Sequence, residues 1–169
     1  MDLALIDRWL HIVAGITWIG LLYYFNFVQA QAMGEAAADE GGPGPAAIGK
    51  YVAPRALLWF RWSALVTWLT GAYYLSVKGI FGAAFMLGMG AESINITGIG
   101  LGAWLGTFML FNVWGVIWPN QKKILGMVEA TDQEKARARR VAFLASRSNV
   151  VMSIPMLMFM QSSMHGLPM

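Results

Sequence analysis

The stretch Trp9–Val28 constrains this chain more than any other. It reads WLHIVAGITWIGLLYYFNFV and contains no Asp, Glu, Lys or Arg. An apolar segment of about 20 residues is long enough to cross a bilayer as a helix. His11, one of two histidines in the sequence, lies inside it. An ionisable side chain in a membrane segment marks a candidate functional site.

The composition extends this interpretation to the whole chain. Of the 169 residues, 57% are hydrophobic and only 12% are charged, against about 25% charged residues in soluble domains. We therefore expect an all-α integral membrane four-helix bundle that forms one transmembrane domain, residues 1–169. The expected spans are 8–30, 55–77, 97–118 and 141–164.

Glycine, proline and capping patterns divide the segments between these spans. Glycine and proline in 31–54 predict an exposed loop. The glycine-rich 79–95 predicts an interfacial or re-entrant piece, and Pro119 predicts the end of the third span. Thr131 and Glu134 form a capping-box pattern that predicts the start of a long final helix. Pro155 is expected to kink that helix.

Basic residues predict the topology. Ten of the twelve lie in, or near the membrane side of, the loops 31–54 and 119–140. They are Lys50, Arg55, Arg61, Lys122, Lys123, Lys135, Arg137, Arg139, Arg140 and Arg147. The positive-inside rule places both loops in the cytoplasm and both termini on the outer, periplasmic side of a bacterial inner membrane. The basic pI of about 9.4 is thereby explained without a nucleic-acid partner.

Two histidines are candidates for a cofactor site near the outer face. His11 lies early in the first span and His165 ends the fourth, so the topology brings both to one side. Neutral imidazoles from two helices can bind haem iron axially, which predicts haem b, with His11 as the iron ligand and Trp18 beside the cofactor. The alternative is that His11 bonds to a carbonyl, His165 is exposed and Trp18 packs in the core. The chain has no Cys, which excludes covalent c-type haem and thiolate metal sites.

A polar layer is predicted near the inner face. Each span carries one of its members a few residues inside its end: Asn26, Arg61, Asn112 and Asn149. Because unpaired polar groups are costly in a membrane, we expect these side chains to face inward and bond to one another. The layer is interpreted either as a structural network from which Arg61 extends to the cytoplasm, or as a site where Arg61 binds an anion or a cofactor carboxylate.

Four stretches resemble a known family. They are 10–20 (LHIVAGITWIG), 60–71 (FRWSALVTWLTG), 111–123 (FNVWGVIWPNQKK) and 146–155 (SRSNVVMSIP), the last running on to His165. With these residues the chain resembles the N-terminal membrane domain of the bacterial membrane-bound urate oxidases (urate hydroxylases). The resemblance implies a membrane domain that passes electrons to a cytochrome c outside the cytoplasm. The chain departs from the family pattern at Ser148, where a histidine is expected. It also ends where the C-terminal cytochrome c domain would begin.

Three functions follow as hypotheses. The first is a small membrane subunit of a redox or electron-transfer system that binds haem b. The second is a structural accessory subunit of a larger respiratory or photosynthetic complex. The third is a urate-oxidising enzyme that passes electrons to a separate cytochrome. The expected partners are the lipid bilayer, other membrane subunits and a periplasmic cytochrome c.

Overall fold

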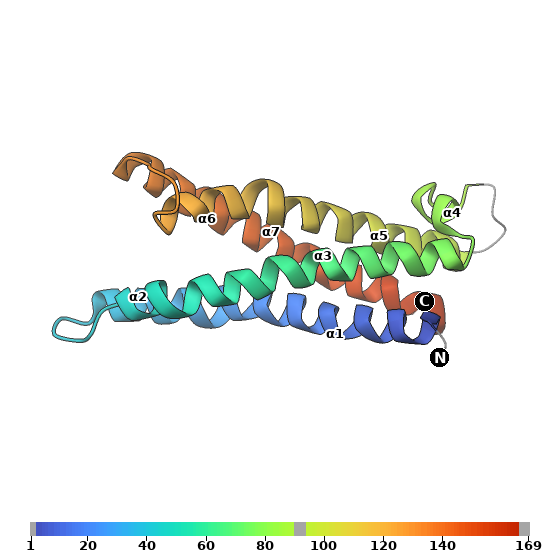
Figure 1. Cartoon of the computed structure of the whole chain (residues 1–169), viewed down its shortest axis with the longest axis horizontal. Coiled ribbons are helices and arrows are strands. Elements are labelled where there is room, and N and C mark those ends of the chain that lie inside the picture. Colours follow the sequence, from blue (N-terminus) through green and yellow to red (C-terminus); the bar gives the residue numbers. More distant parts are fainter. Residues whose placement is uncertain (1–2, 90–93, 166–169) are drawn as a thin grey trace.

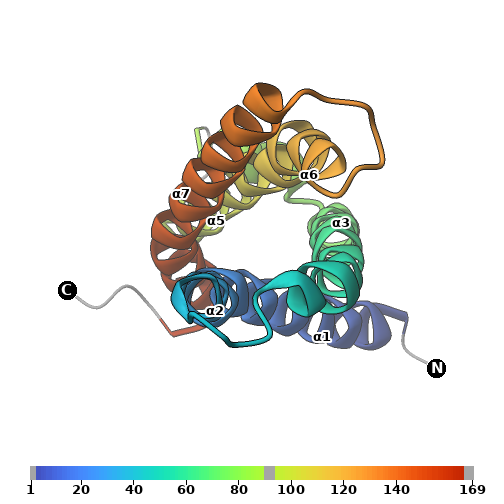
Figure 2. The same cartoon turned by 90° about the vertical axis from the view of Figure 1, so that its left-hand side faces the viewer.

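The described part of the chain is entirely helical, which confirms the all-α prediction. The computed structural model describes residues 3–89 and 94–165, and no strand occurs in these ranges. Long helical rods lie side by side along the long axis (Figure 1). Viewed end-on, they surround that axis (Figure 2).

The first rod is longer than the sequence predicts. Helix α1 (Leu3–Tyr23), the π-helical segment η1 (Tyr24–Gln29) and α2 (Ala30–Ala38) follow one another without interruption. The prediction that the loop begins at residue 31 is therefore wrong. The sequence of α2 is AQAMGEAAA, and alanine has the highest helix propensity of all residues. The irregular part starts after Ala38, where glycines and prolines follow.

The third rod also passes its predicted end. Helix α5 (Ile94–Phe111) continues through the π-helical η3 (Asn112–Ile117) into α6 (Trp118–Ile124). The prediction that Pro119 ends this helix is wrong. Pro119 occupies the first turn of α6, where the missing N–H is tolerated.

The final helix begins as predicted. Helix α7 spans Asp132–His165. The Thr131 backbone N–H donates to Glu134 Oε2 (2.8 Å), and the Glu134 N–H donates to Thr131 Oγ1 (3.2 Å). These two bonds are the reciprocal pair of a capping box. Pro155 lies inside α7, and the helix continues past it.

Three helices in the described ranges are long and apolar enough to cross a membrane: Leu3–Ala38, Asn95–Ile124 and Asp132–Gln161. Helix α3 (Ala53–Val77), which follows the π-helical η2 (Ile48–Val52), has sufficient length but lower hydropathy because it contains Arg55, Arg61 and several Trp, Tyr and Thr residues. The protein is a membrane protein, and the crossing by α3 stays a prediction. The short α4 (Phe81–Phe85) lies in the segment predicted to be interfacial.

The long helices form two pairs. Helix α1 packs on α3, and α5 packs on α7. The first helix of each pair also contacts the second helix of the other pair, α1 with α7 and α5 with α3. Both pairs begin at the same end of the molecule, and α7 ends there as well (Figure 1). Placement of that end on the outer side of the membrane stays a prediction.

The two pairs carry related sequences. The pattern Trp-[Ile/Leu]-Gly, four further residues and Phe-Asn occurs at 18–26 and again at 104–112. The same offset relates Arg61 to Arg147 and Thr67 to Ser153. The Asn of each copy lies in a π-helical segment. The chain is therefore organised as two similar helix pairs that run in the same direction.

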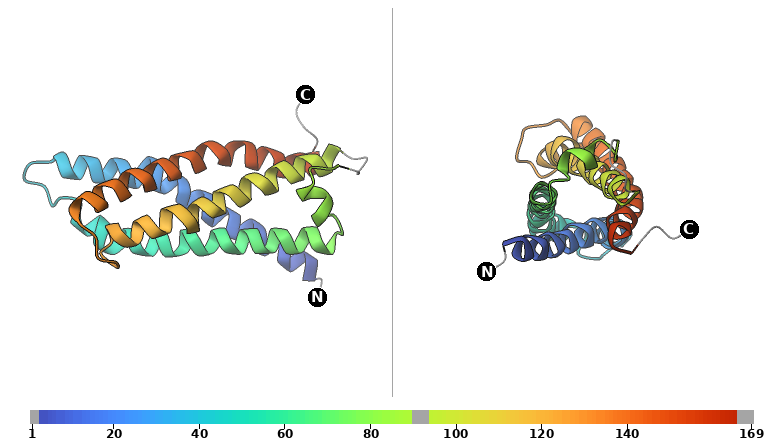
Figure 3. Two further views of the ribbon diagram at one scale, coloured as in Figure 1. Left: turned by 90° about the horizontal axis from the view of Figure 1, so that it is seen from above. Right: turned by 90° about the vertical axis from the view of Figure 1, so that its right-hand side faces the viewer.

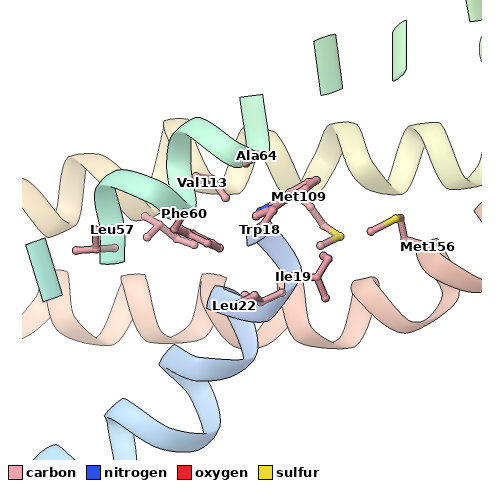
Figure 4. Packing of buried hydrophobic residues seen from close by; sticks show 10 residues of the cluster. Trp18, Ile19, Leu22, Leu57, Phe60, Ala64, Met109, Val113 and Met156 are labelled. Atoms are coloured by element: carbon pink, nitrogen blue, oxygen red, sulfur yellow. The ribbon is translucent and has the colours of Figure 1, made fainter. Parts of the chain in front are cut away.

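The core lies where the pairs meet. Trp18 and Leu22 of α1 share one cluster with Phe60 of α3, and Met109, Val113 and Met156 complete it from the other pair (Figure 4). In a membrane such a core is held by close packing, because lipid tails are as apolar as the side chains.

Candidate functional site

His11 is bonded to α3. Its Nδ1 lies 2.8 Å from the carbonyl oxygen of Thr67 and 3.2 Å from Thr70 Oγ1. A carbonyl oxygen only accepts, so Nδ1 carries the proton in the neutral ring and Nε2 keeps its lone pair. This bond is compatible with either role of His11, structural or metal-binding, because a ligating histidine commonly donates its other N–H to a carbonyl.

The imidazole of His11 packs closely against α3 at Gly71. A Cβ on Gly71 would lie 2.9 Å from His11 Cε1, so the ring fits only because residue 71 has no side chain. The hydroxyls of Thr67 and Thr70 donate to carbonyls of their own helix, Ser63 (2.7 Å) and Val66 (2.7 Å). These bonds leave the side of α3 that faces His11 with its polar groups satisfied.

Besides the Thr67 carbonyl, the carboxylate of Asp7 is a hydrogen-bond acceptor near His11. Asp7 precedes His11 by one helical turn, so the two side chains share one face of α1. The buried Oδ2 of Asp7 has no hydrogen-bond partner within residues 3–89 and 94–165. This end of α1 therefore carries an imidazole and a carboxylate side by side.

A cofactor site that His11 shares with His165 or Trp18 stays a prediction. The backbone of His165 ends α7, and its side chain lies outside the described part of the structure. The hydrogen bonds that join α1 and η1 to α7 are made by Tyr23 and Asn26, whereas His11 bonds to α3 near the start of α1. Trp18 is 2% exposed and belongs to the core cluster. No group of three His, Cys, Asp or Glu residues that could hold a metal ion occurs among the residues that were described.

Three members of the predicted inner layer make bonds between helices, two of them to α7 and the third, Asn149, from α7 itself. Asn26 donates to Ser146 Oγ (2.7 Å) and to the carbonyl of Leu22 (2.8 Å). Asn112 donates to Asn149 Oδ1 (2.9 Å), and Asn149 donates to the Met109 carbonyl (3.1 Å). The layer is thus two separate bonded clusters, both of which fasten a π-helical segment to α7.

Arg61 is bonded differently from the other members of the layer. Its guanidinium carbon lies 3.7 Å from the ring centre of Trp118 and 5.9 Å from that of Trp114. The indole N–H of Trp114 donates to the backbone carbonyl of Arg61 (3.0 Å). Arg61 therefore stacks on the α5–η3–α6 rod through cation–π contacts.

The Asn112–Asn149 bond gives a first stability prediction. Asn149 is fully buried, and Asn149→Ala removes both of its interhelical bonds. We expect a loss of about 1 kcal/mol, since such bonds in membranes average about 0.6 kcal/mol each. Unfolding in detergent micelles measures it. Ser148→Ala removes the exposed 3.4 Å contact to Asn112 and a bond to the Ala145 carbonyl of its own helix. This variant is the control and should change stability by less than about 0.5 kcal/mol. Equal losses in the two variants would contradict the prediction.

Sequence reasoning missed two features of this site. The Thr67 carbonyl and Gly71, which hold His11, carry no polar side-chain signal that identifies them as its neighbours. The repeated Trp-to-Asn spacing was visible in the sequence and pointed to Asn26 and Asn112 as related positions.

These features define a class: a helical membrane protein built from two similar helix pairs, with polar groups bonded between helices and a histidine anchored at one end. The family described as "Urate oxidase N-terminal" matches residues 2–97 and 96–168, and each matched segment contains one helix pair. The chain belongs to the urate oxidase N-terminal family, as the sequence predicted. No characterised protein and no solved structure matches it significantly.

Proposed function

We propose that this protein is a membrane subunit of a urate-oxidising redox system, and that His11 binds haem b through Nε2. Family membership supports the link to urate oxidation. The observation that carries the haem proposal is the 2.8 Å contact of His11 Nδ1 with the Thr67 carbonyl. It fixes the tautomer in which Nε2 can bind iron.

The residues around His11 fit a ligand role. Thr67 orients the ring, Thr70 supports the same nitrogen, and Gly71 lets the imidazole lie against α3. When bound, haem b supplies reversible one-electron transfer. His165 would hold the haem together with His11, and Trp18 is proposed as a residue that would pack beside it. A cytochrome c outside the membrane is the proposed electron acceptor.

Haem content tests the ligand. We expect protein produced with an ample haem supply to carry about one haem per chain, and His11→Ala to lose at least nine-tenths of the Soret absorption because the iron loses its protein nitrogen. Val13→Ala, an exposed position on the same helix, should keep it. Folded wild-type protein without haem, or full haem in His11→Ala, would refute the proposal. His165→Ala should convert a six-coordinate spectrum to a five-coordinate one.

Urate chemistry needs its own assay. Membranes that contain the protein should reduce added cytochrome c when urate is supplied, and His11→Ala membranes should not. A haem-loaded protein without urate-dependent reduction would point to a general electron-transfer subunit. Copurification with a larger complex and no haem would point instead to the accessory role.

A further inference from the structure

An apolar groove opens between α3 and the α5–η3 rod. Its volume is about 380 Å³, and residues of both helices line it, among them Leu65, Leu69, Leu110, Phe111 and Trp114. His11 faces α3 through Thr67, Thr70 and Gly71, none of which lines the groove. The groove therefore requires an explanation of its own.

The polar atoms in the groove are already bonded. Trp68 Nε1 donates to Thr107 Oγ1 (2.9 Å), and that hydroxyl donates to the carbonyl of Ala103 (2.8 Å). A ligand with carbonyl groups, such as a quinone ring, finds no spare donor from these two side chains. A hydrocarbon chain needs none, so the lining favours an acyl chain.

A cation lies just beyond one end of the groove. Trp114 lines the groove and also contacts the Arg61 guanidinium. The stacking of Arg61 on Trp118 covers a face of the guanidinium. The N–H donors of a guanidinium lie in its plane, the geometry that pairs with phosphate. The buried Nε of Arg61 has no partner within the described ranges. Lys122 follows Trp118 by one helical turn, so a second cation lies on the same face of that helix.

We propose that the groove and Arg61 together bind one phospholipid with an anionic headgroup. The acyl chain lies between Leu65, Leu69 and Leu110, and the phosphate meets Arg61 and Lys122. Eight residues of α3 separate Leu69 from Arg61, about 12 Å along the helix, so one lipid molecule reaches both. Basic residues beside a membrane helix attract anionic lipids. This proposal stands apart from haem binding and urate oxidation.

Lipid binding to the purified wild-type protein tests the site. Native mass spectrometry should detect one dioleoyl-phosphatidylglycerol bound at saturation, at least tenfold more tightly than dioleoyl-phosphatidylcholine. Arg61→Gln should remove this preference, and Arg61→Lys should keep part of it. Leu65→Trp, which fills the groove, should lower the binding affinity for both lipids at least tenfold.

Related positions in the second helix pair provide matched controls. Arg147, the counterpart of Arg61, is exposed and contacts only the Phe143 ring by cation–π stacking in the described structure. Arg147→Gln and Val151→Trp, at the counterpart of Leu65, should leave lipid binding unchanged. Equal effects of Arg61→Gln and Arg147→Gln would overturn the proposal, because they would indicate general surface charge. Displacement of the lipid by glycerol phosphate alone would also overturn the proposal. So would a quinone that binds more tightly than the lipid and whose affinity does not change in Arg61→Gln.

Discussion

Trp18→Ala is expected to lower the free energy of unfolding by about 3 kcal/mol, near the lower end of the range for such truncations. Trp18 is 2% exposed and lies where both helix pairs meet, in one cluster with Phe60, Met109 and Met156 (Figure 4). Loss of the indole leaves a cavity, so the two helix pairs pack less tightly against each other. The lower end of the range applies because membrane helices gain packing contacts, rather than a large transfer free energy, when they associate. Unfolding in detergent micelles measures the change.

Trp18→Phe separates packing from hydrogen bonding at the same position. The indole Nε1 of Trp18 is buried and has no hydrogen-bond partner in the described part of the protein. Phenylalanine keeps most of the ring volume and removes this unsatisfied N–H, so we expect a change within about 1 kcal/mol. A loss as large as that of Trp18→Ala would contradict this expectation. It would show that the five-membered ring of the indole, or its N–H, contributes to stability at this position.

Hydropathy located the helices but not their ends. The apolar runs predicted the core of every long helix, because burial in lipid depends on composition over about 20 residues. The ends depend on local backbone preferences: Ala30–Ala38 continues a helix beyond the apolar run. Pro119 was interpreted as a stop signal because a proline inside a regular α-helix breaks a hydrogen bond. The helix instead passes through the π-helical segment Asn112–Ile117 just before Pro119 and continues beyond it. That segment has no simple sequence signature.

The hydrogen-bond partners of the polar layer could not be predicted from the sequence. Counting along each span placed Asn26, Asn112 and Asn149 at one level, and the structure bonds each of them across helices. Which helix face meets which neighbour depends on rotation and crossing, so the pairing of Asn26 with Ser146 could not be derived. In Figure 3, α1 crosses the other rods obliquely. Because of this crossing, His11 contacts α3 whereas Asn26 contacts α7. The predicted depth of each residue along its span does not contain this information.

Gly71→Val is expected to have the second largest effect, a loss of about 1–3 kcal/mol from overpacking. A Cβ at residue 71 would lie 2.9 Å from His11 Cε1 and 3.3 Å from Nδ1. The ring has to move away, which breaks its 2.8 Å contact with the Thr67 carbonyl. Without this bond the tautomer is no longer fixed, so haem affinity should fall at least tenfold, the factor that corresponds to about 1.4 kcal/mol. Detergent unfolding and haem titration measure the two effects separately.

Gly20→Val provides the matched control on α1. A Cβ there meets nothing within 4 Å, and valine is a slightly better helix former than glycine, so stability should change by less than about 0.5 kcal/mol. If Gly71→Val destabilises the protein but leaves haem content intact, the iron ligand is not His11. The close packing of His11 on α3 then has a purely structural role. If both variants lose stability equally, the contact between His11 and α3 is not what makes residue 71 sensitive. Only a combined loss of stability and haem, confined to Gly71→Val, supports a histidine whose packing on α3 prepares it to bind iron.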